Sequence, residues 1–446
     1  LRGRLLPPVA RIGAWRREYN LPVAAPFTFQ HRAEFVPQSS GELLSALPSA
    51  PGVFALRGED PGAQPYLSRA ANLRRRLRRL LAPAETLDAD GRPAPSRRLN
   101  LRSRIRFIEW TPTGSEFESN LLLYHAARQA FGAEPARLRL RLRTPYMLRV
   151  TVSGRHPRVY VTNRLQRRAL AELFGPFPSR AAAERYADAV LDLFQLRRCT
   201  EDLEPYPEHP GCVYGEMNKC LMPCKQGHPS ACTPQQYAQE AQRVFAFLAT
   251  RGASLQDEVA ARREAASQAM DFESAAALHK QWERVRAVAL LADPLVGLIN
   301  RLRLLVVQRG LPEPAERAAD GSGSEETDQP GGPAEAAVFL FAGGQWSGPL
   351  RLAGEANGSG VGAVLESAAA GADCGRVAQP ELDLPALGDA LALLRRWYYR
   401  SEKRRAGEPF LPNPDGSWPK RRILNAAARM APAASAPVAE SPFPHC

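Results

Sequence analysis

The sequence predicts a multidomain protein that combines α/β segments with a helical segment. Its 446 residues are enough for two or three domains. Strand-like and helix-like patterns alternate up to about residue 196, and beyond residue 232 the signals are helical. No apolar run approaches the roughly 20 residues of a membrane-spanning helix, which excludes an integral membrane protein. The start lacks the apolar core and cleavage site of a secretory signal, so we expect a cytoplasmic protein.

Residues 45–145 have the pattern of a small mixed α/β domain, preceded by an N-terminal extension at 1–44. Short runs of β-forming residues alternate with helical runs. The expected elements are strands at 52–56 and near Tyr66, an arginine-rich helix from Asn72, a strand at 105–110 and a helix from Glu118. In the next segment, 146–232, the runs VTVS and RVYVT predict two strands separated by a turn, and 179–196 predicts an amphipathic helix.

Residues 233–295 are predicted to be helical. A capping Thr, a Pro at the first helical position and a Gln three residues after the cap mark a helix start at Thr233-Pro234-Gln235-Gln236. The expected helices run from Pro234 to about Arg251, from Ser254 onward, and from a turn at Met270-Asp271-Phe272 through Leu291. We therefore expect an antiparallel helical hairpin preceded by one helix.

The last third contains two segments that are expected to lack order. Residues 296–335 form a linker, whose part from Glu313 has too few apolar residues to offset the entropy of ordering. Residues 336–430 form a short C-terminal α/β segment. The tail at 431–446 is rich in Ala and Pro and is also expected to be disordered.

The basic charge of the chain is concentrated in its first third. The net charge is +13, and residues 1–150 hold 25 Arg, no Lys and 12 acidic residues. Twelve of these arginines fall between Arg69 and Arg106, a density that suits neutralisation of a phosphate backbone. A general preference for arginine over lysine explains the residue type but not its localisation. Nucleic acid is therefore the leading expected partner.

Four cysteines cluster with the spacing C-x12-C-x7-C-x3-C, namely Cys199, Cys212, Cys220 and Cys224. In a cytosolic chain such clustering indicates a metal site rather than disulfides. The spacing differs from the paired C-x2-C of a zinc ribbon and leaves zinc and an iron–sulfur cluster both open. A set of buried thiols without a ligand is the alternative, and the role of nearby Cys232 is open as well.

Several motifs resemble one family in the order that the family has them. The segments Pro51-Gly52-Val53-Phe54 and Tyr66-Leu67-Ser68-Arg69-Ala70-Ala71-Asn72-Leu73 resemble the PGVY and YVGKAKNL motifs of the GIY-YIG domain of UvrC, the excinuclease subunit of bacterial nucleotide excision repair. The similarity continues at 156–162, 174–178, 196–199 and, in a UVR-like motif, 272–278. More faintly, 337–343, 391–399 and 422–424 resemble the family's following strand, helix and strand.

The resemblance implies a nuclease site in which key positions are substituted. In GIY-YIG nucleases tyrosines help to activate water, an arginine stabilises the phosphate, and a glutamate holds one divalent metal ion. Tyr66 and Arg76 match retained positions, whereas Phe54 replaces the first tyrosine. Tyr124 stands where the metal glutamate belongs, and a neutral phenol does not replace a carboxylate. We expect a degenerate site that needs magnesium only if it is active.

The resemblance also implies which residues bind DNA and a metal cluster. Phosphate contacts fall on the second motif and the helix after it, at Arg69, Asn72, Arg74, Arg75, Arg78 and Arg79. The cysteine cluster matches the family's cysteines, which implies a [4Fe–4S] cluster, with zinc as the alternative.

The UVR-like motif implies a protein partner. Four of its residues share one helix face, with Glu273 beside it: Phe272, Ala275, Ala276 and His279. In the family this hairpin pairs with a similar one in UvrB. The alternative is an intramolecular hairpin with Phe272 in its core.

Together, these features predict a UvrC-like DNA-binding protein of nucleotide excision repair that engages UvrB and has a degenerate nuclease site. An active excinuclease subunit and a non-catalytic UvrB-binding regulator are the alternatives. No Asp-Ile-Ser occurs in the sequence, so we expect the RNase H-like nuclease of the family to be missing.

Overall fold

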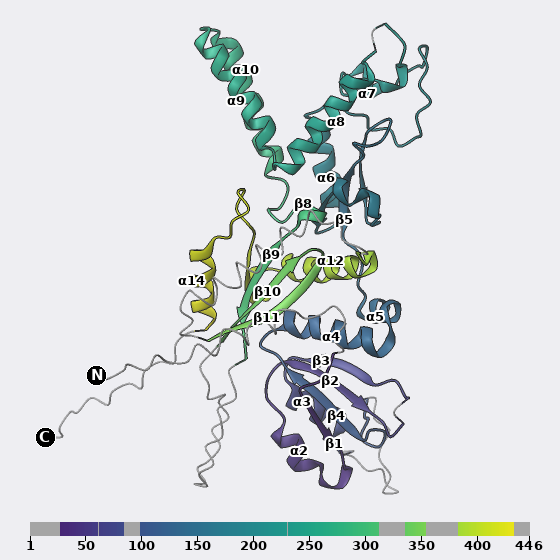
Figure 1. Ribbon diagram of the computed structural model, residues 1–446, viewed down its shortest axis with the longest axis vertical. Helices are drawn as coiled ribbons and strands as arrows, with labels where there is room; N and C mark the ends of the chain where they lie inside the picture. Colours follow the sequence, from purple (N-terminus) through teal and green to yellow (C-terminus); the bar gives the residue numbers. More distant parts are fainter. Residues whose placement is uncertain are drawn as a thin grey trace, which may run out of the picture.

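The computed structural model describes residues 27–60, 62–83, 99–229, 231–311, 335–353 and 382–431. The disorder expected from Glu313 to the residue before Glu335, and in the tail beyond residue 431, falls outside these ranges. The described strands form three four-stranded antiparallel sheets that follow one another along an elongated molecule. Two helical arms project from one end of it (Figure 1).

The first sheet has the order β1-β4-β2-β3 and forms the end of the molecule opposite the arms (Figure 1). Its elements are β1 (His31–Glu34), α2 (Ser40–Ala46), β2 (Gly52–Arg57), β3 (Tyr66–Ala70), α3 (Leu73–Leu81), β4 (Phe107–Pro112), α4 (Glu116–Phe131) and α5 (Ala133–Leu140). Helix α3 packs leucines on Phe54 and Leu56 of β2, while α4 covers the opposite face. Because β1 pairs with β4, this domain begins upstream of residue 45, where the sequence predicted an extension.

The second sheet has the order β6-β5-β7-β8 and carries the cysteine-rich segment. Its elements are β5 (Tyr146–Val150), β6 (Val159–Thr162), β7 (Leu173–Phe177), α6 (Arg180–Leu191), α7 (Val213–Glu216), α8 (Pro234–Ala249) and β8 (Gly297–Leu298). Short 3-10 helices lie at Pro37–Ser39, Arg167–Glu172, Pro223–Lys225 and Ile299–Arg301. Helix α8 begins with the predicted capping box, in which Thr233 and Gln236 bond each other's backbone N–H groups.

The predicted hairpin is present as α9 (Ala253–Gln268) and α10 (Phe272–Ala289), which form one of the two arms (Figure 1). The carboxylate of Asp271 accepts a hydrogen bond from the N–H of Ser274 and thereby caps α10. At the base of the arm, Val259 and Val285 are buried in the apolar core that α6 and α8 form with the second sheet. The hairpin is therefore anchored at one end and free at the other.

The third sheet has the order β11-β10-β9-β12. Its elements are β9 (Leu304–Arg309), β10 (Glu335–Ala342), β11 (Gln345–Ala353), α12 (Leu384–Tyr398), α13 (Glu402–Arg405), β12 (Gly407–Phe410) and α14 (Lys420–Met430). The strand expected at 422–424 is wrong, because these residues belong to α14. Ile423, Ala426 and Ala427 lie on one helix face and pack on the sheet, which a helix achieves and a strand at this place would not.

Helix α12 lies at the centre of the molecule and joins the three domains. Its buried face shares one apolar core with Phe117 and Leu121 of α4, Met147 of β5, and Phe339 of β10. Arg395 and Arg396 extend from it to backbone carbonyl groups of Pro178 and Leu140. In the described part of the chain, no helix is both long and apolar enough to span a membrane.

Candidate functional site

Three of the predicted nuclease residues lie together on the α3 side of the first sheet. Phe54 is fully buried, and its ring centroid is 6.2 Å from that of Tyr66. The Arg76 Nη2 atom donates to the Tyr66 hydroxyl over 3.4 Å. Within the described ranges, no hydrogen bond or ion pair joins a carboxylate to Tyr66 or Arg76. The arrangement keeps an arginine and a phenol in contact, and neither side chain is a carboxylate ligand for a hard cation.

Tyr124 lies outside this group, in the interface between α4 and α12. It is 4% exposed, and its hydroxyl donates to Oδ2 of Asp389 over 3.0 Å and accepts from Arg128 Nη1 over 3.1 Å. Arg137 Nε donates to Oδ1 of the same Asp389 over 2.7 Å. Burial, and then the charge of Asp389, raises the pKa of Tyr124 to about 12. The position predicted for the metal glutamate therefore holds a neutral phenol that links two domains.

Glu118, the nearest carboxylate upstream on α4, is also committed to an interdomain contact. It is 2% exposed, accepts from the N–H of Gly114 over 2.8 Å and pairs with Arg351 Nη2 over 3.1 Å. Burial raises the pKa of Glu118. A carboxylate that is buried and paired in this way is not available to a metal ion on the sheet.

The structure divides the predicted DNA-binding residues between different roles. The side chain of Asn72 caps α3 by accepting from the N–H of Arg75. Arg74 Nε and Arg78 Nε donate to the carbonyl groups of Leu47 and Leu44, so both hold the end of α2. Arg75 and Arg79, one helical turn apart, are exposed. These two side chains are the best placed on α3 for phosphate contacts.

Arg69 belongs to the opposite face of the sheet. Side chains alternate along β3, so Tyr66 and Ala70 face α3 while Arg69 faces α4. Its Nη2 atom pairs with Glu116 Oε1 at 2.8 Å. The predicted set therefore does not form one continuous surface.

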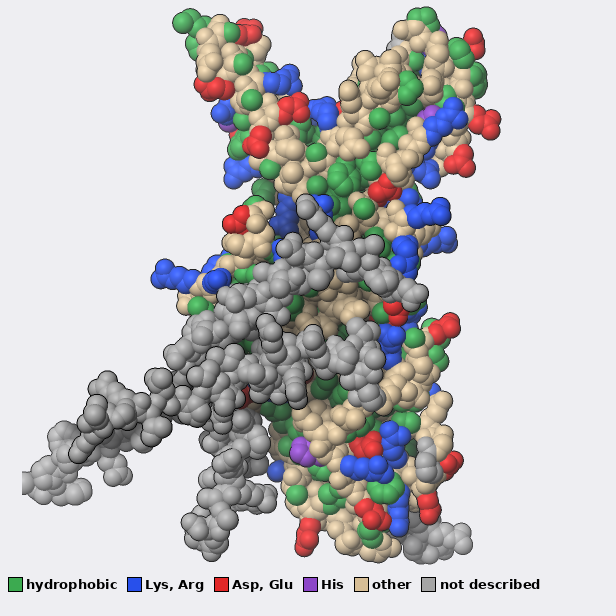
Figure 2. Space-filling model, viewed as in Figure 1, with side chains coloured by type: hydrophobic (Ala, Val, Ile, Leu, Met, Phe, Trp, Pro, Cys, Tyr) green, Lys and Arg blue, Asp and Glu red, His purple; other side chains and the backbone are tan. Residues whose placement is uncertain are grey.

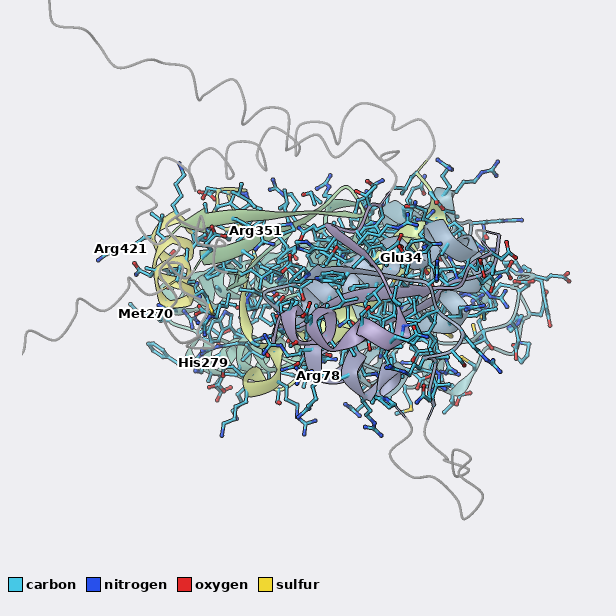
Figure 3. The ribbon with its side chains drawn as sticks, turned by 90° about the horizontal axis from the view of Figure 1, so that it is seen from below. Glu34, Arg78, Met270, His279, Arg351 and Arg421 are labelled. Atoms are coloured by element: carbon cyan, nitrogen blue, oxygen red, sulfur yellow. The ribbon has the colours of Figure 1, made fainter. Side chains whose placement is uncertain are left out.

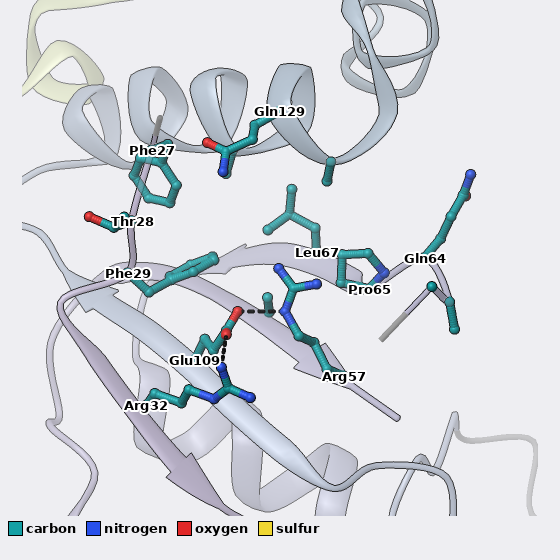
Figure 4. A pocket seen from close by; sticks show the side chains of 15 residues that line it. Phe27, Thr28, Phe29, Arg32, Arg57, Gln64, Pro65, Leu67, Glu109 and Gln129 are labelled. Atoms are coloured by element: carbon teal, nitrogen blue, oxygen red, sulfur yellow. Dashed lines mark hydrogen bonds and ion pairs between the residues drawn. The ribbon is translucent and has the colours of Figure 1, made fainter. Parts of the chain in front are cut away.

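A pocket of about 470 Å³ also opens on the face opposite Phe54 and Tyr66 (Figure 4). Glu109 lies in it and is held by Arg57 at 2.7 Å and Arg32 at 3.7 Å. Its ring side chains come from Phe27 and Phe29. Both arginines of the pocket lining pair with this one buried carboxylate, so each guanidinium group already has an anionic partner.

The four predicted cysteine ligands are gathered in the second arm, on the loops around α7. Cys220 and Cys224 are buried, Cys199 is partly buried and Cys212 is exposed. Burial raises the pKa of Cys220 to about 12, and the charges of the other three cysteines act in the same direction. The Met222 N–H points to Cys220 Sγ at 3.4 Å and Arg197 Nη1 to Cys199 Sγ at 3.6 Å.

These donors fit a thiolate-bound metal in their chemistry, because N–H groups directed at sulfur stabilise thiolate charge. Arg197 also has a buried Nε atom without a hydrogen-bond partner. Among the described residues, however, no group of three or more His, Cys, Asp or Glu side chains is arranged to hold a metal ion. The thiols are near neighbours that do not form a coordination sphere. Burial also raises the pKa of Cys232, and the charge of Cys224 acts on it in the same direction.

The tip of the hairpin is apolar and exposed. Met270 is 78% exposed and Phe272 71%, and hydrophobic side chains are visible at the outer end of this arm in Figure 2. Ala276 and His279 are exposed on the same helix, with Glu273 beside them, and Ala275 is partly exposed. The hairpin is intramolecular, but the alternative prediction that Phe272 lies in its core is wrong. Figure 1 shows α10 and α3 at opposite ends of the molecule, and Figure 3, which looks along that long axis, labels Met270, His279 and Arg78.

The segment that forms most of the second sheet is similar in sequence to known proteins. Residues 146–247 match the family model of the UvrC/Cho excinuclease middle domain. The UvrABC system protein C of Desulforudis audaxviator is 31% identical over 252 residues, which are 55% of this chain and 37% of that protein. This segment of the chain is similar to the UvrC family. The UvrABC system protein C of Alcanivorax borkumensis is likewise 31% identical, over 53% of this chain and 37% of its own length.

The match to the UvrC family is uneven along the chain. Each of these two alignments covers little more than a third of the relative's length. The span of the family model contains all four clustered cysteines and ends within α8. Both Tyr124 and Phe272 lie outside that span. No solved structure matches the chain significantly.

Proposed function

We propose that this chain is a UvrC-like DNA-binding protein of nucleotide excision repair that engages UvrB and does not cut DNA with its first domain. The observation that carries the proposal is the place of Tyr124. The resemblance assigns the metal glutamate to the position of Tyr124, and this side chain is a buried phenol held by Asp389 and Arg128. Without a carboxylate there, a divalent cation has no ligand to offset the charge of a scissile phosphate.

DNA binding needs no such metal. Arg75 and Arg79 project from one face of α3 and can contact successive phosphates as point charges. Arg74 and Arg78 hold α2 against the same helix and so keep this surface rigid. The retained contact between Arg76 and Tyr66 is explained as part of the same scaffold.

UvrB is the proposed protein partner of the hairpin. Phe272 is a bulky apolar anchor, and the small residues Ala275 and Ala276 on the same face let a partner helix approach closely. Phe272→Ala should abolish capture of UvrB. Leu290→Ala is the matched control, because Leu290 is 74% exposed beyond the other end of the same helix. Equal capture by both variants would contradict the assignment.

An iron–sulfur cluster, or zinc in its place, is the proposed occupant of the cysteine-rich arm. Cys199, Cys212, Cys220 and Cys224 would hold it, and the N–H groups of Met222 and Arg197 would stabilise the thiolate charge. Such a group would cross-link the loops around α7. Anaerobic purification followed by an absorption spectrum and metal analysis tests this proposal.

The test of the whole proposal is a nicking assay on a lesion-bearing duplex with UvrB, over a wide range of Mg²⁺ and Mn²⁺. We expect binding without incision. Incision that depends on Tyr66 or Arg76 would favour an active excinuclease instead. A non-catalytic UvrB-binding regulator is the second candidate, supported by the separation of the α9–α10 arm from α3 (Figure 1). Capture of UvrB with no salt-dependent DNA binding would favour that regulator.

A further inference from the structure

A second basic surface lies at the seam between the first domain and the end of α12. Glu116, in the first turn of α4, is held by Arg69 Nη2 at 2.8 Å and by Arg400, whose Nη1 and Nη2 atoms lie 2.8 and 3.1 Å from its two oxygens. A hollow of about 630 Å³ at this place is lined by Glu116, Arg400, Ser401 and Arg404. The three arginines come from β3, from the residue pair after α12 and from α13.

The charges at the seam do not balance. One half-exposed carboxylate, Glu116, faces the guanidinium groups of Arg69 and Arg400, and exposed Arg404 lines the same hollow. The positive field also extends to Arg396. Burial lowers its pKa first, and Arg395, Arg400 and Arg69 lower it further. The pairing of Arg69 and Arg400 with Glu116 in turn holds the pKa of Glu116 below its usual value.

The arginines of the seam are arranged as in an anion-binding site, and the carboxylate of Glu116 occupies the place of the anion. Arg400 holds both oxygens of Glu116 in the two-pronged manner in which arginine binds carboxylates and phosphates. Glu116 is 43% exposed, and ion pairs with that much solvent contribute little. A phosphate carries more acceptor oxygens than a carboxylate and can contact Arg404 at the same time.

We propose that this seam binds a phosphate of the nucleic-acid backbone, with Arg69 and Arg400 exchanging Glu116 for phosphate oxygens and Arg404 contributing from the rim. The proposal rests on the DNA binding proposed above. It adds a contact from the last domain, on the sheet face opposite α3. Because Arg69 and the exposed pair Arg75 and Arg79 lie on opposite sides of the first sheet, the two surfaces can be tested separately.

The test measures binding of the full chain to a labelled duplex as a function of salt concentration. Substituting both Arg400→Gln and Arg404→Gln should lower the slope of log K against log salt by about 1 to 2. Glu116→Gln should tighten binding at low salt by about twofold to fivefold, because it frees Arg69 and Arg400. A gain in affinity cannot arise from misfolding. Arg180→Gln on α6 is the matched control and should change neither quantity.

The outcomes separate this proposal from the proposed function. If the wild-type chain does not bind DNA, both fail. If it binds, and the double substitution leaves the slope intact while Arg75→Gln with Arg79→Gln reduces it, the seam proposal is overturned and the DNA-binding function stands. Inorganic phosphate is titrated in parallel. Phosphate binding that depends on Arg400, with DNA binding that does not, overturns the nucleic-acid assignment in favour of a free anion.

Discussion

Tyr124 and Phe272 are two positions to which the family resemblance assigns a function, and the structure treats them in opposite ways. Tyr124 is 4% exposed and is bonded to the last domain, whereas Phe272 is 71% exposed at the tip of an arm. A buried, fully hydrogen-bonded side chain contributes to the fold. A large apolar side chain left in water contributes little to the fold and is accessible to other molecules. Burial thus distinguishes a position that now serves packing from one still suited to recognition.

The largest effect should come from removing the acceptor that ties Tyr124 to α12. Asp389 is 2% exposed and receives hydrogen bonds from Tyr124 and Arg137. Asp389→Ala leaves these donors without their shared carboxylate and should cost about 3 kcal/mol of unfolding free energy, measured by urea denaturation. Glu184→Ala, which removes an exposed ion pair on α6, is the control and should have no measurable effect. Equal effects would show that the α4–α12 network is not structural.

A smaller loss is expected for Tyr124→Phe. This change removes the hydrogen bond to Asp389 and the one from Arg128, which keeps its contact with Asp383. The ring stays in the apolar core, and Arg137 still pairs with Asp389. The expected cost is about 1 kcal/mol in the same denaturation experiment. Hydrogen exchange of α12 should increase in parallel. A neutral result would mean that the hydroxyl of Tyr124 does not hold the two domains together.

The wild type and Tyr124→Phe should differ in how their free energy of unfolding depends on alkaline pH. The pKa of Tyr124 is raised from 10 to about 12 in the folded chain, so between these values the folded state retains a proton that the unfolded state has lost. Stability from this group is therefore fully present below pH 10 and is lost as the pH rises toward 12. The advantage of the wild type over Tyr124→Phe should shrink across that interval, as followed by urea midpoints. A constant difference would contradict the raised pKa.

Local signals predicted the helices well, because their causes lie within a few residues. The capping residues Thr233 and Asn72, and the hairpin turn around Asp271, all act on N–H groups three residues away. The strand β1 has the polar sequence HRAE and is formed by pairing with β4, far along the chain. The residue pattern of β1 itself does not predict that it pairs with β4. The misassigned strand at 422–424 is helical because tertiary packing on β9 favours a helix.

The sequence names candidate site residues, but the contacts that these residues make come only from the structure. Tyr66, Arg76 and the cysteines were found from motifs, and the structure brings each group together. The acceptor of Tyr124 is Asp389, 265 residues away, which no local pattern reveals. For the same reason the arginine cluster looked uniform in sequence. Only the contacts with α2 distinguish Arg74 and Arg78 from Arg75 and Arg79.

The smallest effect on stability is expected for substitution of Phe272. Phe272→Ala removes a side chain that is mostly in water, so the unfolding free energy should change by less than about 0.5 kcal/mol. Val285→Ala on the same helix is the contrast, because Val285 is fully buried and its truncation should cost more than about 1 kcal/mol. Urea denaturation of both variants measures the two free energies of unfolding. If Phe272→Ala destabilised the chain as much as Val285→Ala, Phe272 would belong to the core in solution, and its exposure could not be used to argue for a partner.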